Sequence, residues 1–200
     1  IENIKFSETT QIIGNYAFYK CSNLRTLDIQ DTITYIGERA FGNCSALESL
    51  SLGKGIDSIG ERAFQNCASL TELVIPANIE SVGNYAFYNC ASLTSVVIPN
   101  SVQSIGDWVF SYCSSLTSVV IPDSVTSMGS SAFLSCDSLT SVVISNSVQS
   151  IGSYAFGGCA SLTYNVKGNL KYLGNSNNPY LYLAGTISND ITSATIDSNC

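Results

Sequence analysis

Eight cysteines are the residues of this chain best suited to chemistry, and seven of them are evenly spaced. The seven recur with a 23-residue spacing, at Cys21, Cys44, Cys67, Cys90, Cys113, Cys136 and Cys159. A catalytic thiol needs a neighbouring base, usually histidine, and the chain contains no histidine. Zinc sites use clustered cysteines rather than single cysteines one repeat apart. We therefore expect no enzyme, no metal site and no cofactor.

Two structural interpretations of the evenly spaced cysteines remain. Equivalent Cα atoms of stacked repeats lie about 5 Å apart, which is within the range of a disulfide bond. However, parallel side chains that point into a core cannot all pair, and a free cysteine packs as a small hydrophobic residue. The pattern therefore favours a column of buried thiols, with disulfide bonds as the alternative. Cys200 is out of register with the other seven and is expected to be exposed.

The spacing of the cysteines belongs to a repeat that includes other residue types. Phe, Gly and Leu recur with the same 23-residue step, from Phe18 to Phe156, from Gly14 to Gly152 and from Leu24 to Leu162. A fixed period in this range, with recurring leucines, is typical of a leucine-rich repeat solenoid. No single repeat can bury its apolar face alone, so the repeats must stack.

Each repeat predicts a main strand. Leu93, Val96 and Ile98 are its inward positions, and Pro99 ends it because proline cannot donate a ladder hydrogen bond. The main strands of successive repeats should form a parallel, concave sheet.

The rest of the repeat predicts a second extended segment and a turn. Val102 and Ile105 form the extended segment, and Gly106 permits a backbone turn. Phe110 and Cys113 then share one face of a short helical or 3₁₀ turn on the convex side.

We expect one domain over residues 1–200, with regular repeats at 1–162, an irregular repeat at 163–190 and a partial repeat at 191–200. The irregular repeat contains a predicted β-hairpin insertion, with strands at 170–173 and 180–184 around a turn at 174–179. The chain begins in mid-pattern with Ile1 rather than Met, so we expect a piece of a longer array.

The composition limits the possible partners. Charged residues make up 12% of the chain, the net charge is −7, and no Lys or Arg lies between Arg62 and Lys167. A nucleic-acid-binding protein needs clustered cations, so nucleic acid is not an expected partner. No apolar run reaches the roughly 18 residues of a membrane span, and no signal peptide is visible.

The outward positions of the main strands are the first candidate binding surface. Four stacked valines lie there beside rows of Ser and Thr, which makes an apolar stripe on a surface with little charge. The alternative is that Val and Thr are simply good strand formers. The candidate residues are Glu72, Val74, Ser95, Val97, Ser118, Val120, Ser141 and Val143.

Aromatic residues on the outer edge are the second candidate surface. Tyr85 and Trp108 share one repeat position with Tyr16 and Tyr154. Exposed aromatic rings suit contacts with proteins or glycans. The same position holds Arg39, Arg62 and Ser131, so the aromatic row is interrupted, and the rings could instead pack on neighbouring turns.

The repeat sequence also resembles a known family. The pattern C-x-S-L-T-S-V-V-I-P-x-S-V-x-S-I-G-x-x-A-F is clearest at Cys90–Phe110 and Cys113–Phe133 and is similar to BspA-like leucine-rich repeats. This resemblance implies a secreted or surface-attached microbial protein that adheres to host matrix proteins or to other cells. It brings no catalytic residues to map onto the chain.

These observations predict a non-enzymatic binding or adhesion module that contacts a protein ligand, such as a host extracellular-matrix protein, or a glycan through its concave sheet. One alternative is a structural spacer that presents another domain. Another is an accessory domain of a larger surface enzyme.

Overall fold

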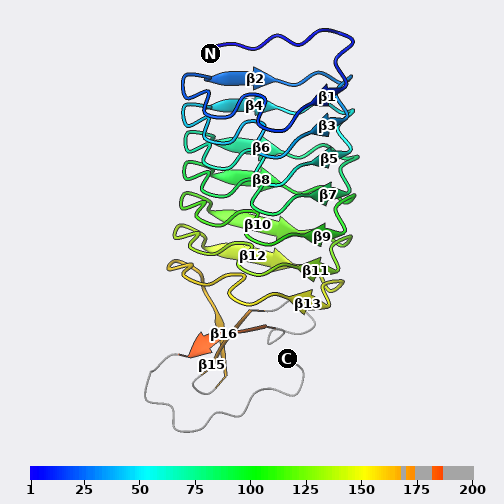
Figure 1. Cartoon of the computed structure of the whole chain (residues 1–200). Helices are drawn as coiled ribbons and strands as arrows, with labels where there is room; N and C mark the ends of the chain where they lie inside the picture. The colour runs from blue at the N-terminus through cyan, green and yellow to red at the C-terminus, as the bar shows by residue number, and fades with distance from the viewer. Residues whose placement is uncertain (168–169, 174–181, 187–200) are drawn as a thin grey trace.

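The computed structural model describes residues 1–167, 170–173 and 182–186 of the chain. Its regular part is a column of stacked repeats, each of which adds one main strand and one shorter strand to the column (Figure 1). The main strands are β2 (Thr26–Asp28), β4 (Ser49–Ser51), β6 (Glu72–Val74), β8 (Ser95–Val97), β10 (Ser118–Ile121) and β12 (Ser141–Ile144). The shorter strands are β1 (Ile12–Ile13), β3 (Tyr35–Ile36), β5 (Ser58–Ile59), β7 (Ser81–Val82), β9 (Ser104–Ile105), β11 (Ser127–Met128) and β13 (Ser150–Ile151).

Both sets of strands are parallel, and their register follows the sequence repeat. Val96 of β8 pairs with Leu73 of β6, and Val119 of β10 pairs with Val142 of β12, so each residue lies beside its equivalent in the neighbouring repeat. The shorter strands pair in the same way, with Ile36 of β3 opposite Ile59 of β5. The predicted leucine-rich repeat solenoid with parallel stacked strands is therefore confirmed.

One continuous hydrophobic core runs through the column because the inward positions of successive repeats carry equivalent side chains. Leu93, Val96 and Ile98 of one repeat are all buried. The phenylalanines from Phe18 to Phe156 form a stack in which neighbouring ring centroids lie 5.3 to 5.7 Å apart. Stacked rings at this spacing make each repeat depend on both of its neighbours.

The segment between glycine and cysteine turns without forming a helix, and no helix occurs in the described part of the chain. Successive i to i+3 hydrogen bonds close this segment, such as the amide of Ala86 to the carbonyl of Gly83. The helical or 3₁₀ turn that the sequence predicted is therefore not confirmed.

The reason lies in two left-handed residues in each turn. Tyr85 has φ of 59° and Asn89 has φ of 56°, and a right-handed helix cannot pass through such residues. Alternate amides of the turn instead donate to the next repeat, as Phe87 does to the carbonyl of Val109 at 3.0 Å. The turns thus add a third set of hydrogen bonds between repeats.

From Gly37 to Gly152, the recurring glycines are required by close packing between repeats rather than by an unusual φ. A Cβ at Gly83 would lie 2.6 Å from the backbone carbonyl carbon of Gly60 and 2.6 Å from the amide nitrogen of Glu61. Backbone atoms cannot move away as a flexible side chain can. The sequence prediction gave a turn role to the equivalent Gly106 and did not include this packing between repeats, although a Cβ at Gly106 would also lie 2.5 Å from Asn84 Oδ1.

This contact predicts the effect of adding a single methyl group. We expect Gly83→Ala to lower the free energy of unfolding by about 1–3 kcal/mol, because the new Cβ forces two repeats apart. Gly14→Ala is the matched control, since a Cβ there meets no atom within 4 Å. Urea unfolding of both variants checks the prediction, and equal losses in the two would contradict it.

The irregular C-terminal part changes from parallel to antiparallel pairing. Strands β14 (Asn165–Lys167), β15 (Leu170–Leu173) and β16 (Tyr182–Thr186) form an antiparallel sheet with β15 in the centre. The predicted pairing of two hairpin strands is confirmed, and β16 contains residues 182–184 of the predicted return strand and continues to Thr186. The sequence did not predict β14. The predicted turn at 174–179, the partial repeat at 191–200 and Cys200 lie outside the described residues.

Candidate functional site

The evenly spaced cysteines are free thiols inside the core. The seven in the described residues form no disulfide bond, and all except the half-buried Cys21 are fully buried. Each buried thiol also donates a hydrogen bond to the phenylalanine carbonyl of the preceding repeat, as Cys90 Sγ does to the carbonyl oxygen of Phe64 at 3.4 Å. The thiol therefore fills space and also provides a second donor to a buried carbonyl.

Burial makes the four thiols from Cys44 to Cys113 poor nucleophiles. It raises the pKa of Cys113 to about 12 and that of Cys90 well above its ordinary value near 9. The thiolate is the reactive form of cysteine, so these residues stay unreactive at neutral pH. No cluster of three or more His, Cys, Asp or Glu side chains suited to a metal occurs among the described residues.

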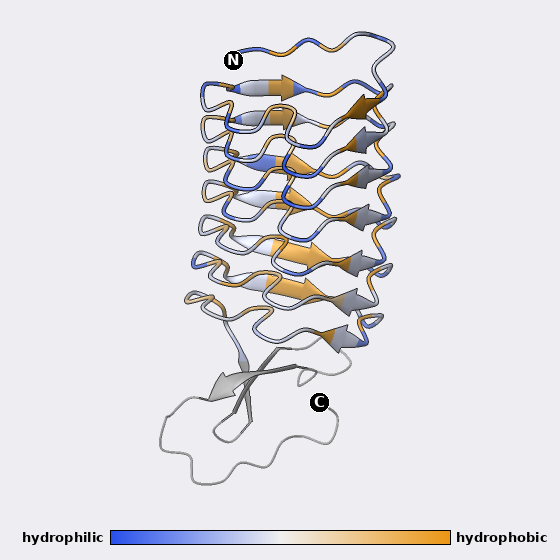
Figure 2. Ribbon diagram, viewed as in Figure 1, coloured by the Kyte–Doolittle hydropathy of each residue, from blue (hydrophilic) through white to orange (hydrophobic). Residues whose placement is uncertain are grey.

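The candidate binding residues of the main strands, from Glu72 to Val143, lie together on the outward side of these strands. We call this side the main-sheet face. Val74, Val97, Val120 and Val143 form a column on it, and 55–64% of each residue is exposed. In Figure 2, the main strands from β6 to β12 have hydrophobic ends, while β2 ends in a hydrophilic residue. This Val column is an exposed apolar stripe across four repeats.

Two rows of hydroxyl groups flank the Val column, and they differ in what they can bind. The Thr row is used by the fold itself, since Thr94 Oγ1 donates to the carbonyl oxygen of Thr71 at 3.0 Å and Thr140 Oγ1 donates to that of Thr117 at 3.1 Å. The exposed row of Ser95, Ser118 and Ser141 has no side-chain hydrogen bond within the described structure. The Ser row can therefore both donate to and accept from a ligand, whereas the Thr hydroxyls already use their donor hydrogen within the fold.

The second set of predicted residues lies on the turns and forms a packed cluster. The rings of Tyr85 and Trp108 are stacked with centroids 5.7 Å apart and planes 6° apart. Tyr88 contacts both rings and also meets Tyr112 edge-on at 5.3 Å. The rings thus pack on neighbouring turns, as one of the two sequence interpretations proposed.

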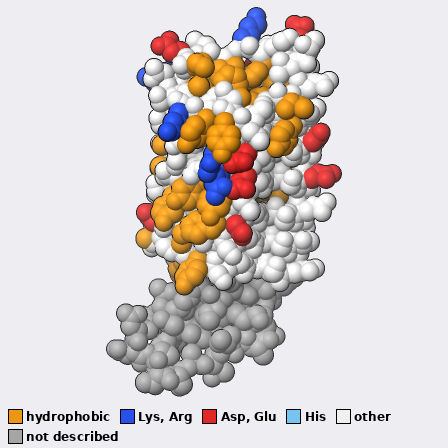
Figure 3. Space-filling model, viewed as in Figure 1, with side chains coloured by type: hydrophobic (Ala, Val, Ile, Leu, Met, Phe, Trp, Pro, Cys, Tyr) orange, Lys and Arg blue, Asp and Glu red, His pale blue; other side chains and the backbone are white. Residues whose placement is uncertain are grey.

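The arginines in this row extend the aromatic stack instead of interrupting it. The guanidinium carbon of Arg62 lies 4.4 Å from the ring centroid of Tyr85, and that of Arg39 lies 5.6 Å from the ring of Tyr16. Arginine stacks on aromatic faces through its planar cation. Figure 3 shows apolar side chains with single charges among them on a face that is otherwise neutral and polar.

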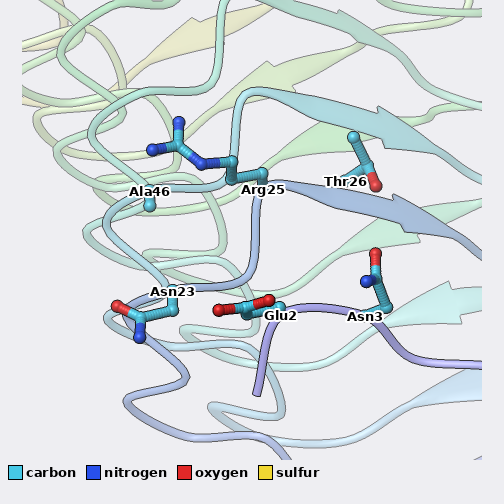
Figure 4. A pocket seen from close by; sticks show the side chains of 6 residues that line it. All are labelled: Glu2, Asn3, Asn23, Arg25, Thr26 and Ala46. Atoms are coloured by element: carbon cyan, nitrogen blue, oxygen red, sulfur yellow. The ribbon is translucent and has the colours of Figure 1, made fainter.

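A hollow near the first residues is a feature that the sequence analysis missed. It has a volume of about 460 Å³ and is lined by Glu2, Asn3, Asn23, Arg25, Thr26 and Ala46 (Figure 4). Arg25 forms an exposed ion pair with Glu48 of the next repeat. Glu2 and Asn3 lie one 23-residue step before Arg25 and Thr26, at positions where the residue type varies between repeats, so the pattern gave no signal for this hollow.

The family of the chain follows from its agreement with a known repeat model. A family described as "BspA type Leucine rich repeat region (6 copies)" matches residues 1–115 and 57–180. The chain belongs to the BspA-type leucine-rich repeat family. The leucine-rich repeat fold, to which this BspA-type array belongs, is typically a non-enzymatic scaffold for protein interactions.

Solved structures of bacterial leucine-rich repeat proteins are similar to this BspA-type array. A leucine-rich repeat protein of T. pallidum (TpLRR) is 33% identical with a TM-score of 0.72, over 76% of this chain and 72% of that one. A leucine-rich cell surface protein from Faecalibacterium prausnitzii is 26% identical with a TM-score of 0.50, over 76% of this chain and 56% of that one. No curated protein matches the sequence. Within the described residues, no helix is long and apolar enough to cross a membrane.

Proposed function

We propose that this BspA-type array is a non-enzymatic protein-binding and adhesion module of a microbial cell-surface or secreted protein, with a host matrix protein as one class of ligand. The observation that carries the proposal is the Val column, whose members are more than half exposed on a regular sheet. Contiguous exposed apolar surface marks partner sites more often than isolated apolar residues do. The similar Faecalibacterium protein, described as a cell surface protein, supports the proposed location.

Binding on this face combines apolar contact with hydrogen bonds. Val97 and Val120 offer apolar area, and Ser95 and Ser118 offer hydroxyl groups beside it on the same face. The only charged residue among the candidates, Glu72, is exposed at the start of β6. Selectivity therefore comes from the shape and spacing of the repeats, since few charges are present to steer a partner.

Surface binding to a panel of immobilised matrix proteins and glycans tests this proposal. We expect the wild-type chain to bind a matrix protein and Val97→Lys/Val120→Lys to lose at least tenfold in affinity, because two ammonium groups then lie in the contact area. Both positions are exposed in the free protein, so the fold should tolerate the change.

The matched control is Ser81→Lys/Ser104→Lys, which adds the same charge at exposed positions of β7 and β9, one repeat apart. This control should bind as the wild type does. Equal losses in both variants would indicate a general charge effect, and equal binding by all three proteins would show that the main-sheet face is not the site.

A stiff spacer is the second candidate function, and the core geometry favours it. The phenylalanine stack runs from Phe18 to Phe156 with ring planes at most 18° apart, so each repeat holds the next at a fixed position. If no panel member binds the wild-type chain, this spacer function becomes the better account.

A further inference from the structure

The ladder of the shorter strands is interrupted between β7 and β9, although these two strands lie in adjacent repeats (Figure 1). At the preceding junction, the amide of Gly83 donates to the carbonyl oxygen of Ile59 at 2.8 Å. The recurring glycines at the other junctions of the described repeats make the same bond, whereas the amide of Gly106 makes none to the carbonyl oxygen of Val82. We call this interruption the β7–β9 junction.

The repeats on either side of the β7–β9 junction are farther apart than other neighbouring repeats. The Phe87 and Phe110 ring centroids lie 5.7 Å apart, compared with 5.3–5.4 Å at the other steps of the phenylalanine stack. Val82 is 9% exposed, whereas Ile59 in the preceding repeat is 2% exposed. An added Cβ at Gly106 would have its nearest backbone contact at 3.4 Å, compared with 2.4–2.7 Å at Gly37, Gly60, Gly83, Gly129 and Gly152. The junction is therefore open on the side of the shorter strands.

The main strands and the turns remain joined across the same junction. β6 pairs with β8, and Leu73 lies opposite Val96. On the turns, the amide of Phe87 donates to the carbonyl oxygen of Val109 at 3.0 Å. Two sides of the column are thus held together while the third side is open, which is the arrangement of a hinge.

Two residues at the junction depart from the repeat in opposite senses. Val109 occupies a position that is Ala in the six equivalent places of the other repeats, and Val82 occupies one that is Ile or Met in the others. Both residues line a small apolar cavity of about 10 Å³, together with Ile105. Val109 therefore adds volume where the repeat has room for one methyl group, and the smaller Val82 leaves a void beside it.

The composition of the core also changes at this junction. Two inward positions carry larger residues before it and valine after it. At the first position Leu27, Leu50 and Leu73 are followed by Val96, Val119 and Val142, and at the second Ile33, Ile56 and Ile79 are followed by Val102, Val125 and Val148. Because protein cores are close-packed and transmit strain, a mismatch between two packing patterns collects where they meet.

We propose that the β7–β9 junction is a hinge between two stiff blocks of the array, residues 12–89 and 90–162, and that Val109 is the wedge that holds it open. Within each block, the phenylalanine stack and the unbroken ladder of shorter strands keep the repeats in place. The Val column crosses the junction between Val74 and Val97, so bending at the hinge changes the curvature of the main-sheet face. This inference goes beyond the proposed function, because it concerns how the array bends and not what it binds.

NMR relaxation dispersion and amide hydrogen exchange on the whole chain test the hinge. The methyl groups of Val82 and Ile105 should show exchange on the microsecond-to-millisecond timescale, and those of Ile36 should show none. The amide of Gly106 should exchange with solvent at least tenfold faster than that of Gly129, which is hydrogen-bonded to the preceding repeat.

Removing the wedge is the decisive variant. Val109→Ala restores the residue of the other repeats, so the gap should close, the amide exchange of Gly106 should slow at least tenfold, and the methyl dispersion of Val82 should disappear. Val125→Ala is the matched control, because it removes the same two carbons from a fully buried position of the next repeat. It should leave the exchange rate of the Gly106 amide unchanged.

Moving the wedge is the reciprocal variant. Ala132 occupies the position of Val109 in the next repeat, where the amide of Gly129 donates to the carbonyl oxygen of Ile105 at 2.7 Å. Ala132→Val should break this bond, so the amide exchange of Gly129 should become at least tenfold faster.

Three results would overturn the proposal. They are equal amide exchange of Gly106 and Gly129 in the wild type, methyl dispersion spread evenly through the core, and an unchanged rate for Gly106 in folded Val109→Ala. If Val109→Ala does not fold, Ala132→Val decides the role of the wedge. A Gly129 amide that keeps its wild-type exchange rate in that variant would show that the extra volume does not open the junction.

Discussion

We expect the free energy of unfolding to fall steeply above pH 9, because the buried thiols resist ionisation. Burial raises the pKa of Cys113 to about 12, and it raises the pKa values of Cys67 and Cys90 well above their ordinary value near 9. Between pH 9 and pH 11 the unfolded chain loses these protons and the folded chain keeps them, so the unfolded state gains stability as pH rises.

The expected size of the effect follows from linkage. Between pH 9 and pH 11, each such thiol lowers the free energy of unfolding by about 1.4 kcal/mol per pH unit. Three thiols together therefore lower it by about 4 kcal/mol per pH unit. A typical unfolding free energy is about 5–15 kcal/mol, so much of it should be lost by pH 11. Urea unfolding at pH 7.5, 9, 10 and 11 with a reductant present measures this slope.

The control for the pH effect is the triple variant Cys67→Ala/Cys90→Ala/Cys113→Ala. It should be less stable than the wild type at pH 7.5, because three buried sulfur atoms and their hydrogen bonds to phenylalanine carbonyls are lost. Its stability should nevertheless fall less steeply above pH 9. Burial also raises the pKa of Tyr88, but that residue is common to both proteins. Equal slopes in the two proteins would show that the thiols do not control alkaline unfolding.

Phe87→Ala should be the most damaging single substitution of the core, with a loss of about 3–5 kcal/mol of unfolding free energy. Phe87 is fully buried, and its ring stacks on Phe64 at 5.4 Å and on Phe110 at 5.7 Å. Removing it leaves a cavity in the middle of the stack and separates the repeats on either side. Chemical unfolding followed by circular dichroism measures the loss.

Phe18→Ala is the matched control, because Phe18 occupies the same repeat position but is only half-buried. It stacks on Phe41 on one side and meets Phe6 edge-on on the other. A smaller loss than that of Phe87→Ala is expected, since the first repeat can open without separating the rest. Similar losses in the two variants would contradict the view that the stack couples neighbouring repeats.

Much of the fold could be predicted from the sequence because the repeat is strict. The regular step of Leu, Phe and Cys determines which residues of neighbouring repeats lie side by side, and the observed register follows it, with Val96 opposite Leu73. The alternation in the main strand separates buried Val96 from exposed Val97. The lack of histidine and the spacing of the cysteines likewise favoured buried thiols, and six of the seven free cysteines in the described residues are buried.

The sequence alone could not decide how side chains of different types meet across repeats. Tyr85 and Asn89 adopt left-handed backbone although neither is glycine, because hydrogen bonds to the next repeat outweigh the local preference. Arg62 looked like a break in an aromatic row, whereas stacking places its guanidinium over Tyr85. Residue type and spacing therefore determined the repeat, its core and its faces. The close contact between repeats decided the turns, the role of the glycines and the stacking of Arg62 on Tyr85, because those features depend on distances that arise only when the repeats stack.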